Sequence, residues 1–125
     1  MIFKIRTSKK TMELFEEITA SEHLQPFVLS KLAISLSIKN SDPLSEKDFN
    51  RDTNGLELNR QTITGEHDLL FKALIEMRER RHLEDDEYFQ KYLRAHLNRG
   101  AKLLHREYRY GRDFLLQILN SDDNI

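Results

Sequence analysis

The chain has 125 residues, of which a third are charged and 38% are hydrophobic, with no cysteine and a formal net charge of −1. This length predicts one domain, residues 1–125, with a core of its own. The lack of cysteine excludes disulfides, thiolate metal sites and a cysteine nucleophile. Because no long apolar run and no apolar leader are present, we expect a cytoplasmic protein that does not enter a membrane.

The first forty residues predict a strand and two helices. The string FKIRT alternates apolar and charged residues, as a short half-buried strand does. Ser8 is placed to cap a helix from about Lys9 to Ala20. Pro26 suits the first position of a second helix. That helix is apolar on most sides, which places it in the core or at a subunit interface; its apolar residues include Leu29, Leu32, Ala33, Ile34 and Leu36.

The middle of the chain predicts a loop, a strand and a helix. Residues about 39–55 are polar and rich in turn formers, so we expect a long loop. The string LELNRQTIT, residues 56–64, suggests a short strand. A helix follows from Glu66 to about Arg81, with Leu70, Leu74 and Met77 on one face.

The last third predicts one long helix. Acidic residues 84–87 favour its positive N-terminal end, and it runs to about residue 108 or 110, about 35 Å. Gly111 ends it, and residues 112–119 form a last short helix in the less characteristic segment, about 105–125. The predicted fold is therefore mainly α, a compact helical domain with a short N-terminal strand. The buried stripe of the long helix is Phe89, Leu93, Leu97 and Leu104.

This long helix is strongly basic. Residues 90–112 hold seven bases and one acid, whereas residues 41–70 hold three bases and seven acids. The bases fall within about 140° of helix surface, and their mutual repulsion is not compensated by acids on the same helix. Tyr88, Tyr92 and Tyr110 lie in or beside the same arc. The seven bases are Lys91, Arg94, Arg99, Lys102, Arg106, Arg109 and Arg112.

Three interpretations of this helix remain open. Its bases could pair with the acidic segment 41–70 in a purely structural role. They could bind a phosphate backbone together with Lys4, Arg6, Lys9 and Lys10. A basic amphipathic helix is also typical of contacts with a membrane surface or a protein partner.

Two other patterns suggest chemistry but are weaker. Asp48, Asn50, Asp52 and Asn54 are spaced like the start of a calcium loop, but the glycine and the bidentate glutamate that such a loop needs are missing. We interpret this stretch as a polar turn. The acids at 84–87 could hold Mg²⁺ in a nuclease, yet charge at a helix N-terminus explains them more simply.

The remaining candidates do not form an active site. The five histidines are scattered, and His96 is placed as a satisfied core residue rather than a ligand. No phosphate-cradling glycine loop or zinc motif is present. We expect no catalytic residues, no metal and no cofactor.

Four strings resemble the DndE family, the small protein of the bacterial DNA phosphorothioation system. They are FKIRTSKKTMELFEEI, LSKLAISLSIK, DTNGLELNRQTITGEHDLLFKALI and LEDDEYFQKYLRAHLNRGAKLL, in this order over residues 3 to about 104. The resemblance implies an accessory protein of the machinery that replaces a non-bridging phosphate oxygen of DNA with sulfur. It also implies binding to duplex DNA, preferably nicked, and a compact homotetramer.

The resemblance implies protein partners as well, namely the cysteine desulfurase, sulfurtransferase-like and ATPase components. Lys9 and Lys10 lie in a matching string, as do Arg60, Arg94 and Arg99, although no individual role follows. Without cysteine the chain has no residue to carry a persulfide, which agrees with a DNA-handling role. The strand and two helices at the start also resemble a ribbon-helix-helix unit, in which two chains pair their strands and Lys4 and Arg6 enter a DNA groove.

We therefore expect a homo-oligomeric DNA-binding accessory protein, without its own enzymatic activity, that contacts phosphates with little sequence preference. The alternatives are an assembly subunit that does not bind DNA, a metal-dependent nicking nuclease using residues 84–87, and a ribbon-helix-helix regulator. The expected DNA-binding residues are Lys4, Arg6, Lys9, Lys10, Lys91, Arg94, Arg99, Lys102, Arg106 and Arg109.

Overall fold

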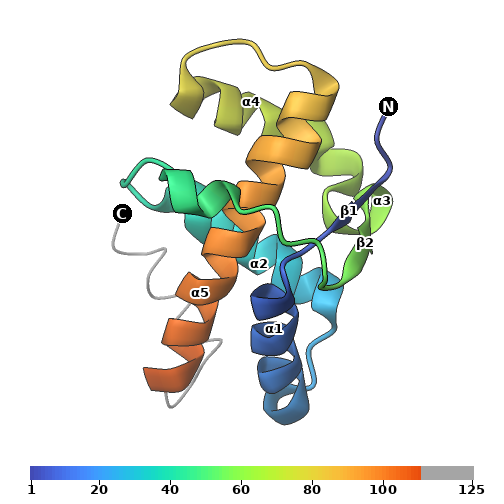
Figure 1. Cartoon of the computed structure of the whole chain (residues 1–125), viewed down its shortest axis with the longest axis vertical. Coiled ribbons are helices and arrows are strands. Elements are labelled where there is room, and N and C mark those ends of the chain that lie inside the picture. The colour runs from blue at the N-terminus through green and yellow to red at the C-terminus, as the bar shows by residue number, and fades with distance from the viewer. Residues whose placement is uncertain (111–125) are drawn as a thin grey trace.

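The computed structural model describes residues 1–110; Gly111, Arg112 and the predicted last helix lie outside these described residues. The fold is mainly α, as predicted, with one two-stranded antiparallel sheet (Figure 1). No helix in residues 1–110 is long and apolar enough to cross a membrane.

The elements are β1 (Lys4–Arg6), α1 (Lys9–Glu22), α2 (Pro26–Lys39), the 3-10 turn η1 (Glu46–Phe49), β2 (Glu57–Asn59), α3 (Arg60–Ile63), the 3-10 turn η2 (Gly65–His67), α4 (Asp68–Glu79), the π-helical segment η3 (Glu87–Leu93) and α5 (Arg94–Tyr110).

The start of α1 is fixed by side chains on both sides of it. Ser8 caps the helix as predicted, since its Oγ accepts from the Thr11 backbone N–H at 3.1 Å. The Asn98 amide oxygen of α5 then accepts from the Ser8 N–H at 3.3 Å and from the Thr11 hydroxyl at 2.7 Å. This buried network positions α1, and the basic residues of its first turn, against α5.

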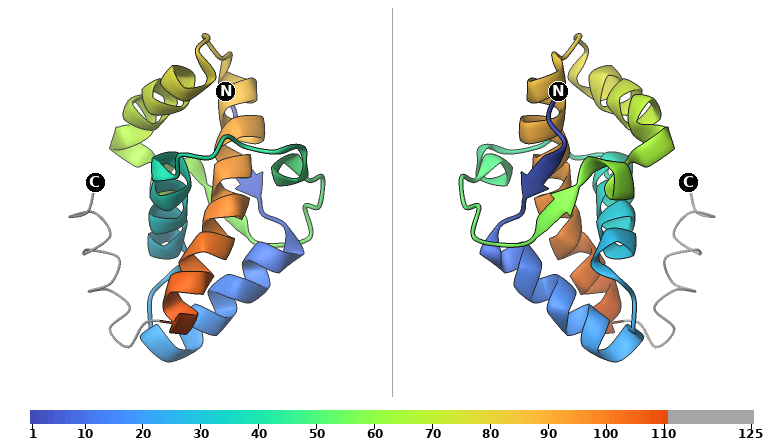
Figure 2. Two further views of the ribbon diagram at one scale, coloured as in Figure 1. Left: turned by 90° about the vertical axis from the view of Figure 1, so that its left-hand side faces the viewer. Right: turned by 90° about the vertical axis from the view of Figure 1, so that its right-hand side faces the viewer.

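The closest helix packing is between α2 and α5. A Cβ added at Gly100 would lie 1.8 Å from the Ala33 carbonyl oxygen, so only glycine permits this approach. Leu29, Ala33 and Ile34 of α2 are fully buried there, which confirms the central place predicted for this helix. Figure 2 shows α5 running between α1 and α2, and it packs against both.

The predicted long helix is built in two parts. Seven residues near its start, Glu87–Leu93, form the wider π-helical segment η3, and α5 continues from Arg94. The predicted stripe is confirmed, because Phe89, Leu93, Leu97 and Leu104 are all fully buried. In η3 the adjacent Tyr88 and Phe89 are both fully buried. The tyrosine prediction was therefore wrong at Tyr88, whose ring fills the core. Tyr92 is 8% exposed, and the centre of its ring lies 5.4 Å from Lys91 Nζ, beside the bases as predicted.

The sheet joins the two ends of the first half of the chain. Ile5 pairs with Leu58 and Arg6 with Glu57, so the strand predicted at residues 56–64 ends at Asn59. There the Arg60 N–H still bonds the Phe3 carbonyl, but the chain turns into α3 and buries the Arg60 side chain. Burial of that guanidinium explains why the strand does not continue.

A ribbon-helix-helix arrangement does not fit this sheet. The Phe3 carbonyl accepts from the Arg60 N–H, and the Thr7 N–H donates to the Leu56 carbonyl, both in the same chain. Successive residues of a strand point their backbone groups to opposite edges, so the Arg6 carbonyl lies on the edge of β1 away from β2. That carbonyl accepts from Arg94 Nε at 2.7 Å. One edge of β1 is thus paired with β2, and Arg94 occupies the other edge at Arg6. This arrangement disfavours the ribbon-helix-helix alternative, in which two chains pair this strand.

A buried arginine joins α3, α4, η3 and the N-terminus. The Arg60 side chain is 8% exposed and bonds Asp68 at 2.7 Å and Asp85 at 2.8 Å. It also donates to the Ile2 carbonyl at 2.9 Å, and its guanidinium lies 4.5 Å from the centre of the Phe89 ring. We call Arg60, Asp68 and Asp85 the Arg60 cluster.

Both carboxylates of the cluster are held in their charged form. Burial opposes ionisation of Asp68, but hydrogen bonds from Arg60, Thr64 and Tyr88 outweigh it and lower its pKa. The Arg60 hydrogen bonds are the main cause that lowers the pKa of Asp85, with a smaller contribution from the Ile2 N–H. The cluster therefore contributes stability only while both aspartates are ionised.

The long predicted loop holds one turn and is anchored by arginines. Its turn η1 starts with a capping box formed by Ser45 and Asp48. Arg78 donates to the carbonyls of Ile38 at 2.8 Å and Asp42 at 3.0 Å. A loop of this length stays ordered because side chains from helices satisfy its backbone carbonyls.

The Gly100→Ala variant should be less stable than the wild type by about 1–3 kcal/mol, because its methyl group would overlap the α2 backbone. Gly65→Ala is the matched control, since no atom lies within 4 Å of a Cβ there, although its φ of +52° adds backbone strain. Urea unfolding of both variants measures the difference. A Gly100→Ala loss no larger than that of Gly65→Ala would contradict the close packing.

The free energy of unfolding should fall as the pH drops below about 4, the ordinary aspartate pKa. Asp68 and Asp85 have lowered pKa values in the folded chain, so the unfolded chain binds protons at a higher pH than the folded chain does. Arg60→Met should lower stability by about 3 kcal/mol at neutral pH, since it leaves two carboxylates unpaired. It should also flatten the acid dependence. Urea unfolding across pH tests this, with Arg81→Met, which removes an exposed pair with Glu87, as the control.

Candidate nucleic-acid interface

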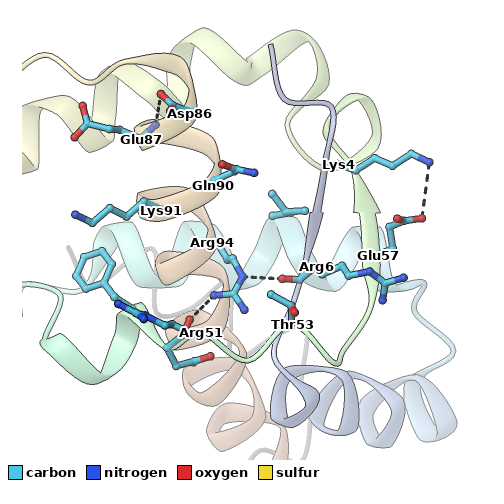
Figure 3. A pocket seen from close by; sticks show the side chains of 13 residues that line it. Lys4, Arg6, Arg51, Thr53, Glu57, Asp86, Glu87, Gln90, Lys91 and Arg94 are labelled. Atoms are coloured by element: carbon cyan, nitrogen blue, oxygen red, sulfur yellow. Dashed lines mark hydrogen bonds and ion pairs between the residues drawn. The ribbon is translucent and has the colours of Figure 1, made fainter.

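A cleft of about 760 Å³ lies between β1, the loop after η1 and the start of the basic helix (Figure 3). Three segments far apart in sequence supply five cations to its walls. Its acids, Glu57, Asp86 and Glu87, lie on β2 and at the start of the helix. The five cations are Lys4, Arg6, Arg51, Lys91 and Arg94.

Strand alternation places the first two cations at the cleft. Ile5 points into the core and is 5% exposed, so Lys4 and Arg6 on either side of it point outward. Lys4 Nζ lies 3.8 Å from Glu57 of the paired strand, a pair that is half exposed and therefore weak. Within residues 1–110, Arg6 has no ion pair and its guanidinium is available to a ligand.

Lys91 and Arg51 complete the exposed positive charge. Lys91 Nζ lies 5.6 Å from the centre of the Phe49 ring and 5.4 Å from that of Tyr92. These rings orient the ammonium group without neutralising it. Arg51 is exposed in the loop and, in the described part of the chain, pairs with no acid. Arg51 was not among the predicted binding residues, because a loop has no periodicity and Arg51 lies in the acidic segment 41–70.

Arg94 forms the floor of the cleft and supports its walls. Its guanidinium donates to the carbonyls of Arg6 at 2.7 Å, Asn50 at 2.6 Å and Asp52. Burial lowers the pKa of Arg94, and nearby Asp52 partly offsets this. The arginine thereby joins β1, the loop and α5, and each of its three nitrogens already donates one hydrogen bond.

The same loop caps α1. Backbone hydrogen bonds from Lys9 at 2.9 Å and Asn54 at 2.9 Å lower the pKa of Asp52. An ionised Asp52 at the N-terminus of α1 stabilises the helix dipole. The exposed side chains of Lys9 and Lys10 follow directly, so they lie next to the loop that walls the cleft. In the stretch spaced like the start of a calcium loop, the Asn50 side-chain oxygen accepts from the Asp52 N–H at 3.1 Å. This oxygen therefore binds the backbone of the loop.

Arg99 also has internal partners. It donates to the Ser37 hydroxyl at 2.8 Å and carbonyl at 2.6 Å, and to the Asp42 carbonyl at 2.8 Å. The Ser37 hydroxyl lies 2.8 Å from His96 Nδ1. Burial, with Arg99 and Arg78 nearby, lowers the pKa of His96 to about 3, so this histidine is a neutral core residue, as predicted. It is satisfied only at Nδ1, because its buried Nε2 has no hydrogen-bond partner in residues 1–110.

The remaining predicted bases form a separate row. Lys102, Arg106 and Arg109 are exposed on α5 and fall within about 60° of its surface. Arg106 also borders a smaller cavity of about 220 Å³ between α2 and α5. The structure thus brings Lys4, Arg6 and Lys91 together at the cleft and places this row farther along the same helix.

The acids at residues 84–87 are engaged separately. Asp85 belongs to the Arg60 cluster, Glu87 bonds Arg81 at 3.1 Å, and Asp86 accepts from the Glu87 N–H at 3.0 Å. Hydrogen bonds from Arg81 and from the Glu84 backbone lower the pKa of Glu87. In residues 1–110, no three His, Asp or Glu side chains are grouped to hold a metal ion.

Comparisons with known proteins agree on one family. The family model of the DNA sulphur modification protein DndE matches residues 4–111. The crystal structure of DndE from Escherichia coli B7A, described as involved in DNA phosphorothioation modification, has a TM-score of 0.65 at 19% identity, over 81% of this chain and 96% of that chain. A mutant DndE crystal structure has a TM-score of 0.65 at 19% identity, over 82% and 97%. No curated protein sequence matches significantly.

Arg94→Ala should lower the free energy of unfolding by about 2 kcal/mol, because several backbone carbonyls lose their buried donor. It should also speed amide hydrogen exchange in the loop that carries Asp52. Lys91→Ala removes a neighbouring exposed cation and should change stability by less than about 0.5 kcal/mol. Equal losses in the two variants, in urea unfolding, would show that Arg94 is not the support described.

Proposed function

The chain belongs to the DndE family, part of the DNA phosphorothioation system, and we propose that it is the subunit that binds duplex DNA there, preferentially at nicks, through phosphates. The observation that carries this proposal is a set of exposed cations without internal ion pairs around one cleft, namely Arg6, Arg51 and Lys91. A surface of this kind matches a phosphate backbone, which attracts cations regardless of base sequence.

The contact surface extends beyond the cleft. Lys9 and Lys10 lie on the α1 side, and the row Lys102, Arg106 and Arg109 continues along α5. Lys91 and Arg106 are fifteen residues apart, about 22 Å of helix, which corresponds to about six base pairs of duplex. The surface is therefore long enough for phosphates on both sides of a strand break.

Arg94 and Arg99 serve this surface indirectly. Each nitrogen of the two guanidinium groups already donates within the chain, mostly to backbone carbonyls, so we assign them to shaping the cleft instead of contacting phosphates. The acids Asp86 and Glu87, about one turn before Lys91 on the same helical run, repel phosphates and would confine the backbone to the cationic part of the cleft. A preference for nicks has a physical basis, because a broken strand bends onto such a surface at lower cost.

The proposed role fits a system with several components. A chain without cysteine has no thiol to carry sulfur, so sulfur transfer would fall to the desulfurase, sulfurtransferase-like and ATPase proteins. In this proposal the protein is a cytoplasmic homotetramer without a cofactor or catalytic activity of its own. A pure assembly role is the second candidate, and the exposed apolar face of α4 favours it.

Fluorescence anisotropy on a nicked duplex and its sealed counterpart tests the proposal. With about five phosphates engaged, log K should fall against log salt with a slope near −4.5, and the nicked duplex should bind more tightly. Arg6→Glu and Lys91→Glu should each weaken binding at least tenfold and reduce the slope by about 1.

Lys31→Glu is the matched control, because Lys31 is exposed on α2 and does not line the cleft. This charge reversal should change affinity much less than the two cleft variants do. No binding at low salt would rule out the proposed role and favour assembly. Equal affinity for the two duplexes would remove the preference for nicks.

A further inference from the structure

Helix α4 has two apolar faces, and only one of them is buried. Its inner face packs through Ile75, which is fully buried, and the partly buried Phe71. Its outer face carries Leu69, Leu70 and Met77, which are 79%, 57% and 74% exposed. Leu74 and the exposed Ala73 continue this face, which we call the α4 stripe.

The α4 stripe has the spacing of a helix-pairing surface. Its five residues recur at intervals of three and four, so they form one continuous band without a charged side chain inside it. Apolar residues exposed singly are ordinary, whereas a continuous band marks an interaction site. Helix α4 lies at the end of the molecule opposite the free end of α1 (Figure 1), and none of the stripe residues lines the cationic cleft.

The charges at the ends of the stripe favour a second copy of this chain as the occupant. Glu66, with a side chain 87% exposed, precedes the stripe, and the exposed Arg80 follows it. Each lies seven residues from Ala73, while Leu69 and Met77 each lie four residues from it. In an antiparallel pair centred on Ala73, leucine therefore meets methionine, and each glutamate meets an arginine of the other copy.

We propose that two copies of the chain pair through the α4 stripe, antiparallel, about a two-fold axis near Ala73. Such a contact is isologous, because the same patch on both copies covers itself and leaves no open end. The inference rests on the homo-oligomeric part of the proposed function and is independent of DNA binding. It assigns the contact to a surface that leaves the cationic cleft of each copy accessible.

Cysteine cross-linking tests this geometry directly, since the wild-type chain has no cysteine to interfere. Under mild oxidation without DNA, Ala73→Cys should form a disulfide-linked dimer, because the two-fold axis brings residue 73 next to its own copy. Leu69→Cys alone should not, because the two copies of residue 69 are offset by about 12 Å, beyond the roughly 7 Å limit for a disulfide. An equal mixture of Leu69→Cys and Met77→Cys should cross-link again.

Sedimentation over a range of protein concentrations supplies the second measurement. The double variant Leu70→Glu, Met77→Glu should lose this association while its circular dichroism stays unchanged, because both residues are exposed. Gln61→Glu adds charge at an exposed position outside the stripe and should associate like the wild type. Glu66→Arg should weaken association, and adding Arg80→Glu should restore it.

Three results would overturn the proposal: a wild type that stays monomeric, Leu69→Cys cross-linking as readily as Ala73→Cys, or an unchanged association of the double variant. A monomeric wild type would leave the stripe to a different protein. Failure of DNA binding is a separate result, because the cross-linking and sedimentation contain no DNA. Cross-linking at Ala73 with no DNA binding would keep the pairing and reject only the proposed function.

Discussion

The fold depends on one buried guanidinium. Arg60 joins α3 to α4 through Asp68, to the basic helix through Asp85 and to the N-terminus through the Ile2 carbonyl. Because a buried charge is tolerated only with well-placed partners, these segments must adopt their positions together. Formation of this cluster positions β1, and β1 carries two of the cations of the cleft.

Apart from the Arg60 cluster, arginines of two kinds shape the surface around the cleft in residues 1–110. Arg78, Arg94 and Arg99 each donate to a backbone carbonyl of the long loop. Arg6 and Arg51 point outward without acidic partners in residues 1–110. The excess of positive charge in the helical run is therefore partly structural. Fewer of the basic side chains are therefore available to a ligand than the number of bases in the sequence indicates.

Local patterns predicted the helices well and the partners of charged groups poorly. Ser8, Pro26 and the stripe of Leu93 and Leu97 depend on sequence-local spacing, so the helix starts and the core face were predictable. Arg94 and Arg99 could not be assigned, because their acceptors lie more than forty residues away on loop carbonyls. Arg51 reaches the cleft only through tertiary folding. The outward direction of the α4 stripe also follows from packing, since both faces of that helix are apolar.

The contacts of the N-terminal segment have a consequence for synthesis on the ribosome. Ile2 bonds Asp85 and Ser8 bonds Asn98, while β1 pairs with β2 in the middle of the chain, so the first residues made find all of these partners much later in the sequence. Long-range contacts of this kind form late, because the intervening chain must first be closed. The nascent protein therefore completes its core only after most of α5 has emerged, and chains truncated before Asn98 lack the partner that fixes α1.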